Sequence, residues 1–342
     1  MPTCNTSRYG WHLSGTGAVA NLERKLAGWY GLPHALAVSS ATSGLMGIAL
    51  ALDLAGTEFV TTPYTWGGSL APWLALGCHP VFADIDPRTL TLDPHSVAAR
   101  ITKRTRAILA VDIDGTPCDS VALRKVADDH GVWYIADAAQ SLGATMGGHP
   151  ASVDADALVV SFTSGKTLDV GEGGAVITPH ASLYERLIWH TQHPQRQTRE
   201  LGLGVTNELA INARIHPNAA LEADERFDDA LVKTATRQDW CFGVLHWLEQ
   251  SGLIEPTGIP GHDARCPSFY RVSVAVQPNC PKNIDAQLED WLSRAAFQVR
   301  VECSPVSVVY RLPGFSALHQ TSAPCPNTEQ QHERRRVIRP ID

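Results

Sequence analysis

The sequence lacks the features that mark several classes of protein. Its 342 residues contain no apolar run of the ~20 residues that a membrane span needs, and the N-terminal MPTCNTSRYGWH has no signal-peptide core. We therefore expect a cytoplasmic protein with no membrane partner. Positive charge is also scarce, since the formal net charge is −7 at pH 7. Nucleic acids are held by grouped Lys and Arg residues, so we expect no nucleic-acid partner.

Paired metal-ligand motifs are missing too. The eight cysteines include no C-x-x-C pair, and their spacing suggests neither a disulfide framework nor a zinc site. We interpret them as mostly reduced thiols. His190 and His193 are expected on the solvated surface, because no third ligand accompanies them. The basic run Arg334 to Arg336 is interpreted as the solvated face of a helix. No metal site is expected.

The composition present is that of a globular protein, with 44% apolar and 18% charged residues. Between residues 17 and 180, short β-branched runs alternate with segments of helical period, which predicts an α/β core with a mainly parallel seven-stranded sheet. The predicted strands are His34–Val38, Phe59–Thr62, Pro80–Asp84, Ala107–Asp112, Val132–Ala136, Ala157–Ser161 and Ala175–Thr178. The predicted helices are Ala18–Tyr30, Ser43–Leu54, Gly67–Leu76, Pro94–Ile101, Ser120–His130 and Ala181–His190.

The pattern changes beyond residue 193. A polar stretch up to residue 217 is expected to be an ordered connecting loop, and a long helix follows over Asn218–Gln250. A strand over Tyr270–Val276, a helix over Ile284–Ala296 and a strand over Gln298–Glu302 then indicate a smaller α+β domain. We divide the chain into a large domain, residues 1–225, and a small C-terminal domain, residues 226–342.

Two polar clusters follow the first two predicted strands, where ligands of open α/β sheets gather. Thr42 and Ser43 open a helix, whose N-terminal N–H groups favour a phosphate, although such residues are usually only helix caps. Trp66 opens another helix. Its flat indole is suited to stacking on an aromatic cofactor ring, and a core or interface tryptophan is the equal alternative.

Two further clusters carry ionisable groups. Asp137 ends a predicted strand and Gln140 follows it; a buried carboxylate needs a cation such as a protonated pyridine nitrogen, and a capping Asp is the alternative. Ser161 opens the stretch Ser-Phe-Thr-Ser-Gly-Lys166, which continues to a Gly-Glu-Gly-Gly turn. Lysine forms Schiff bases once its ammonium loses a proton, but a lone loop lysine usually has no such role. Because all four clusters occur together, the Schiff-base role becomes the preferred interpretation of Lys166.

Taken in order, Ser-x-Thr, Pro-x-Thr-Trp, Asp-x-x-Gln and Ser-Phe-x-x-x-Lys…Gly-Glu-Gly-Gly resemble the DegT/DnrJ/EryC1/StrS family of sugar and cyclitol aminotransferases, which depend on pyridoxal 5'-phosphate (PLP). The resemblance extends from GWHLSGTGAVANLE to CPNTEQQHERRRVIRP. It implies a PLP-dependent fold of the aspartate-aminotransferase type (fold type I). It also implies a homodimer whose active sites are shared between subunits.

The resemblance assigns roles to individual residues. Lys166 would form the Schiff base with PLP, and Asp137 would pair with the ring nitrogen. Gln140 would lie near the phenolic oxygen of the ring, and Trp66 would stack on one ring face. The remaining assignments concern the phosphate, which would be held by Thr42, Ser43 and Ser161 of one subunit and by Asn212 of its neighbour.

Two places depart from the pattern of the common family members. Asp112 stands where many relatives have a histidine, and Thr163-Ser-Gly165 replaces more usual residues just before Lys166. Both are expected near the substrate side, so the acceptor stays open. The chain also ends at Asp342, short of a final helix that many relatives add.

The leading hypothesis is an aminotransferase that moves an amino group from glutamate or glutamine to a keto-sugar, a cyclitol or a related small carbonyl in natural-product biosynthesis. A PLP enzyme of another reaction type, such as elimination, replacement or cyclisation, is the second hypothesis. A non-catalytic protein on this fold is the third. Retention of Lys166 argues against the family's dehydratase branch, in which a histidine replaces the lysine.

Overall fold

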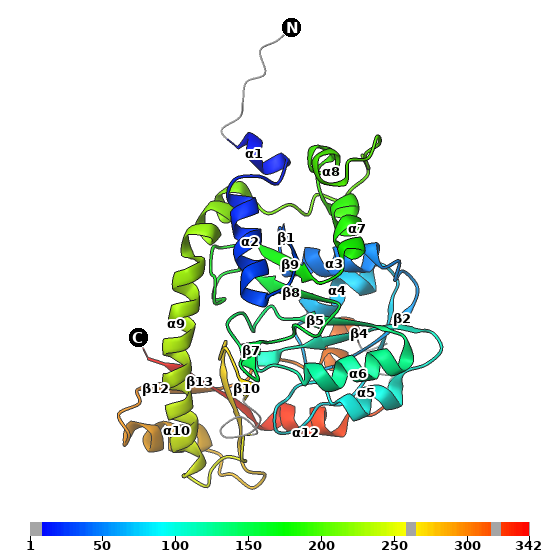
Figure 1. Cartoon of the computed structure of the whole chain (residues 1–342). Helices are drawn as coiled ribbons and strands as arrows, with labels where there is room; N and C mark the ends of the chain where they lie inside the picture. The colour runs from blue at the N-terminus through cyan, green and yellow to red at the C-terminus, as the bar shows by residue number, and fades with distance from the viewer. Residues whose placement is uncertain (1–8, 258–264, 316–322, 342) are drawn as a thin grey trace.

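A seven-stranded sheet lies between two layers of helices at the centre of the fold (Figure 1). The computed structural model describes residues 9–257, 265–315 and 323–341. The strand order is β1-β9-β8-β5-β4-β2-β3. The five neighbouring strands β8, β5, β4, β2 and β3 are parallel to one another, whereas β9 runs antiparallel to its neighbours β1 and β8. These strands are β1 His34–Val38, β2 Glu58–Thr61, β3 His79–Phe82, β4 Thr105–Val111, β5 Trp133–Asp137, β8 Ala157–Ser161 and β9 Gly174–Thr178.

Both faces of this sheet are apolar, as the near-continuous apolar strands require. In β4, for example, Ile108 belongs to one core and the next residue, Leu109, to the other. One core is closed by α2 Ala18–Tyr30, α5 Pro94–Arg100, α6 Ser120–His130 and the first half of α9 Pro217–Glu249. The other is closed by α3 Ala41–Ala51, α4 Gly67–Ala75 and α7 Ala181–Thr191. The predicted fold class is confirmed.

A smaller α+β region follows the sheet in the chain. Its antiparallel sheet has the order β11-β13-β12, formed by Val272–Ala275, Arg335–Pro340 and Val299–Cys303. The helix α10 Ile284–Ser293 and the second half of α9 pack on it through their leucine and valine side chains. The predicted boundary between residues 225 and 226 lies inside α9, which runs from the large sheet to the small one (Figure 1).

Two short segments connect the large sheet with the smaller α+β region. A small sheet joins β6 Thr145–Met146 and β7 His149–Pro150 to β10 Arg265–Cys266, far along the chain. The 3-10 turn η1 Ile113–Gly115 after β4 meets the loop before β11, because Ser268 N–H donates to Gly115 O and Arg271 N–H to Asp114 O. The remaining named elements are α1 Gly10–Leu13, α8 Pro194–Leu201, η2 Val309–Arg311, η3 Pro313–Phe315 and α12 Pro326–Arg334.

The predicted elements are all present, with ends shifted by at most three residues. Two expectations were wrong. The loop expected up to residue 217 contains α8, which begins with Pro194 and is capped by the ring of His193. Helical geometry there brings Arg196 into the core, where its guanidinium pairs with Glu23 at 2.9 Å.

The second error concerns the basic run Arg334 to Arg336. It is not a solvated helix face, because α12 ends at Arg334 and the buried Arg335 begins β13. Arg334 pairs with Glu255 at 2.6 Å, and Arg336 with Asp285 at 2.5 Å. The three arginine side chains are therefore largely buried. Arg335 and Arg336 are successive residues of a strand, so their side chains point to opposite faces of the small sheet.

Over the described part of the chain, no helix combines the length and apolarity that crossing a membrane requires. The cysteines found there are free thiols, and Cys4 lies outside the described residues. No group of three or more metal-ligating side chains occurs among residues 9–257, 265–315 and 323–341.

Candidate active site

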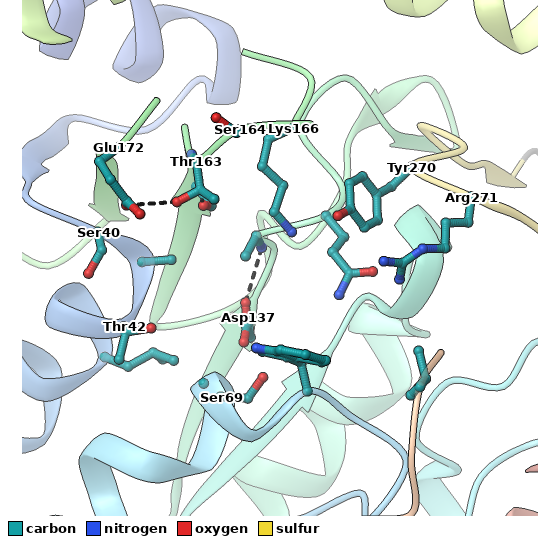
Figure 2. A pocket seen from close by; sticks show the side chains of 18 of the residues that line it. Ser40, Thr42, Ser69, Asp137, Thr163, Ser164, Lys166, Glu172, Tyr270 and Arg271 are labelled. Atoms are coloured by element: carbon teal, nitrogen blue, oxygen red, sulfur yellow. Dashed lines mark hydrogen bonds between the residues drawn. The ribbon is translucent and has the colours of Figure 1, made fainter. Parts of the chain in front are cut away.

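A cavity of about 670 Å³ opens at the carboxyl ends of the central strands (Figure 2). Four of the sequence clusters meet in it. The side chains come from the start of α3, the start of α4, the end of β5 and the loop after β8, and the loop before β11 closes the other side. Predicted residues that line it are Thr42, Trp66, Asp137, Gln140, Ser161 and Lys166.

Hydroxyl groups and a helix N-terminus form one wall. Ser40 is the N-cap of α3, and its side chain accepts from Ser43 N–H while the Ser43 hydroxyl accepts from Ser40 N–H. This capping box uses the Ser43 side chain, which does not line the cavity. Ser39, Ser40 and the exposed Thr42 line it instead. The wall offers hydroxyls and the positive end of a helix dipole to an anion.

Asp137 lies at the end of β5 and is only 5% exposed. Its carboxylate accepts hydrogen bonds from Ser69 and from Ala139 N–H. Burial raises the pKa of this carboxyl, and the Ser69 hydrogen bond opposes that shift. The Lys166 charge also lowers this pKa, but both of these hydrogen-bond donors to the carboxylate are neutral, which suits it to a cationic ring nitrogen.

Lys166 reaches into the same cavity from the loop after β8 (Figure 2). Its ammonium lies 4.1 Å from the centre of the Tyr270 ring. Burial lowers the pKa of the Lys166 amine to about 8, and the Asp137 charge acts in the opposite direction. An amine with this pKa is available as a nucleophile near neutral pH, as Schiff-base formation requires.

The other predicted residues have distinct surroundings. Trp66 is the N-cap residue of α4, and 67% of its surface is exposed beside the cavity. Gln140 accepts a hydrogen bond of 2.8 Å from Asp114 N–H through its side-chain oxygen. Ser161 ends β8, and its hydroxyl accepts from Thr163 N–H. Asn212 is exposed and does not line the cavity.

Asp112 does not face the cavity, contrary to expectation. It is 1% exposed and accepts from the hydroxyls of Ser141 and Ser152 and from Cys118 N–H. Burial raises the pKa of its carboxyl. The side chain therefore organises the turn after β4, because β4 points it toward the protein interior. Thr163 and Ser164, in contrast, do line the cavity.

Sequence reasoning missed several lining residues. Ser69 follows Trp66 by three positions, so one turn of α4 brings it to the same side. Tyr270 and Arg271 belong to the loop before β11, more than 100 residues beyond Lys166 in the chain. The contact arises from tertiary packing, because this loop is hydrogen-bonded to η1, to Gln140 and to α9.

The donor set fits PLP. A hydroxyl-rich helix N-terminus suits its phosphate, a buried carboxylate with neutral hydrogen-bond donors suits its ring nitrogen, and an amine of lowered pKa suits its aldehyde. The cavity volume of about 670 Å³ is also in the range of cofactor sites.

A family model described as the DegT/DnrJ/EryC1/StrS aminotransferase family matches residues 4–339. The chain belongs to this family. Its aminotransferases depend on PLP, which is the cofactor of the site described above. The fold is accordingly that of the PLP-dependent enzymes of fold type I.

Among its relatives, the L-glutamine:2-deoxy-scyllo-inosose aminotransferase of Streptomyces lividus is 37% identical over 279 residues, covering 77% of this chain and 65% of that protein. The UDP-2-acetamido-2-deoxy-3-oxo-D-glucuronate aminotransferase of Pseudomonas aeruginosa is 33% identical, covering 59% of this chain and 57% of that protein. The first curated relatives are matched over about half of their length or less, such as 47% of the spore coat polysaccharide biosynthesis protein SpsC of Bacillus subtilis.

Solved structures agree on the family fold. The aminotransferase from Psychrobacter cryohalolentis superposes with a TM-score of 0.81 at 25% identity, covering 93% of this chain and 85% of that chain. The structure of DesI with its TDP-sugar product gives a TM-score of 0.76 at 30% identity, covering 97% of this chain and 82% of that chain.

Proposed function

We propose that this chain is a PLP-dependent aminotransferase that moves an amino group from glutamate or glutamine to a keto-sugar, a cyclitol or a related small carbonyl. One observation carries the proposal: Lys166 and Asp137 enter one cavity from different elements, beside a hydroxyl-lined helix N-terminus (Figure 2). The names of the relatives, which include glutamine:inosose and keto-sugar aminotransferases, support the choice of substrates.

Different lining residues bind different parts of the cofactor. Thr42, with Ser39 and Ser40, binds the phosphate at the start of α3, and Ser161 completes this site from β8. Trp66 covers one face of the ring. Ser43 supports the site indirectly, since its hydroxyl fixes the capping box of α3.

The chemistry uses two ionisable side chains. PLP supplies an electron sink when bound, which lets the α-carbon of an amino donor lose a proton. Asp137 keeps a proton on the ring nitrogen, because its buried carboxylate is stabilised by a cation at that atom. Lys166, as a free amine, would take the proton from the α-carbon of the donor and return it to the C4′ carbon of the cofactor. Gln140, which lines the cavity, would lie near the phenolic oxygen of the ring.

The assembly and setting form part of the proposal. We propose a homodimer in which Asn212 reaches the phosphate of the neighbouring subunit. Four apolar side chains in the segment before α9 are exposed, as expected of a surface that a second subunit covers: Leu203, Val205, Leu209 and Ile211. We also propose a cytoplasmic location, consistent with the free cysteines, and a role in natural-product biosynthesis.

The proposal is tested by the visible spectrum of the purified protein. It predicts a yellow protein whose colour is lost on borohydride reduction and is absent from Lys166→Ala. Glutamate or glutamine should convert the wild type to the spectrum of pyridoxamine phosphate, and a keto-sugar or cyclitol ketone should restore the original one. A protein that binds PLP but releases an eliminated group without this conversion contradicts transamination. A colourless protein that never takes up PLP contradicts any PLP enzyme.

A further inference from the structure

The two substrates of the proposed reaction differ in charge. Glutamate and glutamine carry an α-carboxylate, whereas a keto-sugar or cyclitol ketone is neutral at the reacting end. A carboxylate that enters a partly buried cavity needs a cation or several donors to replace its hydration. Both substrates must react at the same place. The site therefore needs a cation that binds the carboxylate of the amino donor without obstructing the neutral acceptor.

Arg271 is suited to this task. Among the described residues that line the cavity, the cationic side chains are Lys166 and Arg271. Lys166 is engaged with the cofactor, so Arg271 is the cation left for a substrate. The Arg271 guanidinium lies 4.6 Å from the centre of the Tyr270 ring, and the Lys166 ammonium lies 4.1 Å from the same centre. Both cations therefore lie against a single aromatic ring of the cavity wall.

The Arg271 guanidinium is held in place, but most of its N–H donors remain available to a ligand. One of its nitrogens lies 3.3 Å from an Asp114 carboxylate oxygen, the single hydrogen bond that the Arg271 side chain makes within the described residues. Its side chain is 21% exposed. A guanidinium has five N–H donors in a planar fork, so the other edge stays open for a bidentate contact with a carboxylate.

Asp114 fixes the orientation of the Arg271 guanidinium. It is 2% exposed and adopts a left-handed backbone with φ 54°. Its N–H donates to Gln140 Oε1 at 2.8 Å, and its carbonyl accepts from Arg271 N–H at 3.1 Å. The Asp114 carboxylate also supplies a counter-charge when no donor is bound. Arg271 therefore does not stand as an unpaired cation while a neutral acceptor reacts.

We propose that Arg271 binds the α-carboxylate of the amino donor and that Asp114 is the residue that positions it. The inference rests on the proposed transaminase function and deepens it. Arg271 comes from the small region and Lys166 from the large sheet, so donor recognition depends on the docking of the loop before β11 onto η1.

The test separates binding from turnover in the PLP-loaded protein. The probe is 2-methylglutamate, which carries the α-carboxylate but has no α-proton to lose, titrated by the change in the cofactor spectrum. Arg271→Gln should weaken its binding by ~10–100-fold, the usual range for a hydrogen-bonded charge pair, and Arg271→Lys should recover part of that loss. Binding of 4-aminobutanoate, which keeps the γ-carboxylate of glutamate but lacks the α-carboxylate, should be unchanged. Asp114→Asn should weaken 2-methylglutamate binding less than Arg271→Gln does.

Two controls make the outcome specific. Arg339→Gln removes a half-exposed cation from the neighbouring groove that Arg271 also lines, and it should leave both titrations as in the wild type. The pyridoxamine phosphate form of Arg271→Gln should react with the acceptor within about threefold of wild type, well below the effect expected on the donor.

Wild-type binding of 2-methylglutamate by Arg271→Gln overturns the inference, as does an equal loss for the donor and acceptor steps. If Arg271→Gln does not fold, Arg271→Lys decides: unchanged affinity for 2-methylglutamate overturns the inference. A wild type that shows no spectral conversion with glutamate or glutamine contradicts the proposed function instead, so the two failures are distinguishable.

Discussion

Lys166 has an amine whose pKa is lowered to about 8 by burial. The neutral fraction of such an amine at pH 7 is roughly 10%, whereas an unperturbed lysine at pKa ~10.4 is less than 0.1% neutral. Because the lowered pKa belongs to a cation, the reactive neutral form increases as pH rises and reaches half near pH 8. We therefore predict that the rate of PLP uptake by cofactor-free protein rises with pH and levels off above about 8. A surface lysine such as Lys125, whose pKa is raised by Asp129, offers the contrast.

Stopped-flow absorbance across this pH range measures the midpoint. A midpoint near the ordinary lysine value would contradict the desolvated environment of Lys166. Lys166→Met should abolish the pH-dependent phase, and Lys125→Met should leave it unchanged.

Asp137 is the second residue on which the site depends. Its buried carboxylate receives hydrogen bonds from Ser69 and Ala139 N–H, and we expect the cofactor's ring nitrogen to complete its shell. Asp137→Asn removes the charge while conserving size. Removing one partner of a buried ion pair costs about 3–5 kcal/mol, so the PLP dissociation constant should rise ~10²–10⁴-fold, measured by equilibrium dialysis. Unchanged affinity would mean that Asp137 only caps the turn.

The N-terminus of α3 separates two roles that looked alike in the sequence. The Ser43 hydroxyl closes the capping box with Ser40, whereas Thr42 lines the cavity. Ser43→Ala should therefore lower the free energy of unfolding by ~1 kcal/mol, as loss of a cap does. Thr42→Val should leave it within ~0.5 kcal/mol but weaken PLP binding by roughly tenfold. Denaturant unfolding and PLP titration of both variants measure this, and the reverse pattern would refute the assignment.

The turn η1 is the element that joins the small region to the site. Gly115 has φ 88°, and a Cβ there would lie 2.3 Å from Ser268 Oγ and 2.8 Å from Tyr270 N. Gly115→Ala should displace the loop that carries Arg271, so donor binding should fall along with stability. Gly131→Ala is the matched control, because this glycine also has positive φ but has no atom within 4 Å of the added carbon. It should cost ~1 kcal/mol of stability and leave donor binding unchanged.

The strands, their parallel order and the ligand end of the sheet were predictable, because apolar runs and their period report burial directly. Asp137, Trp66 and Ser161 were predictable because each lies at the end of a strand or the start of a helix. Lys166, in the loop after β8, was predictable from the other clusters and from the resemblance of its flanking motif to the family. Arg271 was not, since the loop before β11 reaches the cavity through tertiary contacts with η1, with Gln140 and with α9, all distant in the sequence. Arg335 was misread because a charge run in sequence does not reveal that a strand buries it.

At the scale of the whole molecule, the exposed apolar segment before α9 and the exposed Asn212 lead to a test of the shared site. Lys166→Ala and Asn212→Ala homodimers should each be inactive or strongly impaired. Mixed after unfolding and refolding together, they form hybrid dimers in which one site has both wild-type residues. Activity should then recover to roughly one quarter of wild type, the share expected for random pairing in a symmetric dimer. No recovery would contradict a site shared through Asn212.

The identity of the cofactor-bearing residue is the claim on which the rest depends. Borohydride reduction of the PLP-loaded protein, followed by proteolysis and mass spectrometry, locates the phosphopyridoxyl group on the chain. The structure predicts a single modified peptide with the group on Lys166, and none from Lys166→Ala. Stoichiometric modification of another lysine, or unchanged cofactor attachment in Lys166→Ala, would contradict the account.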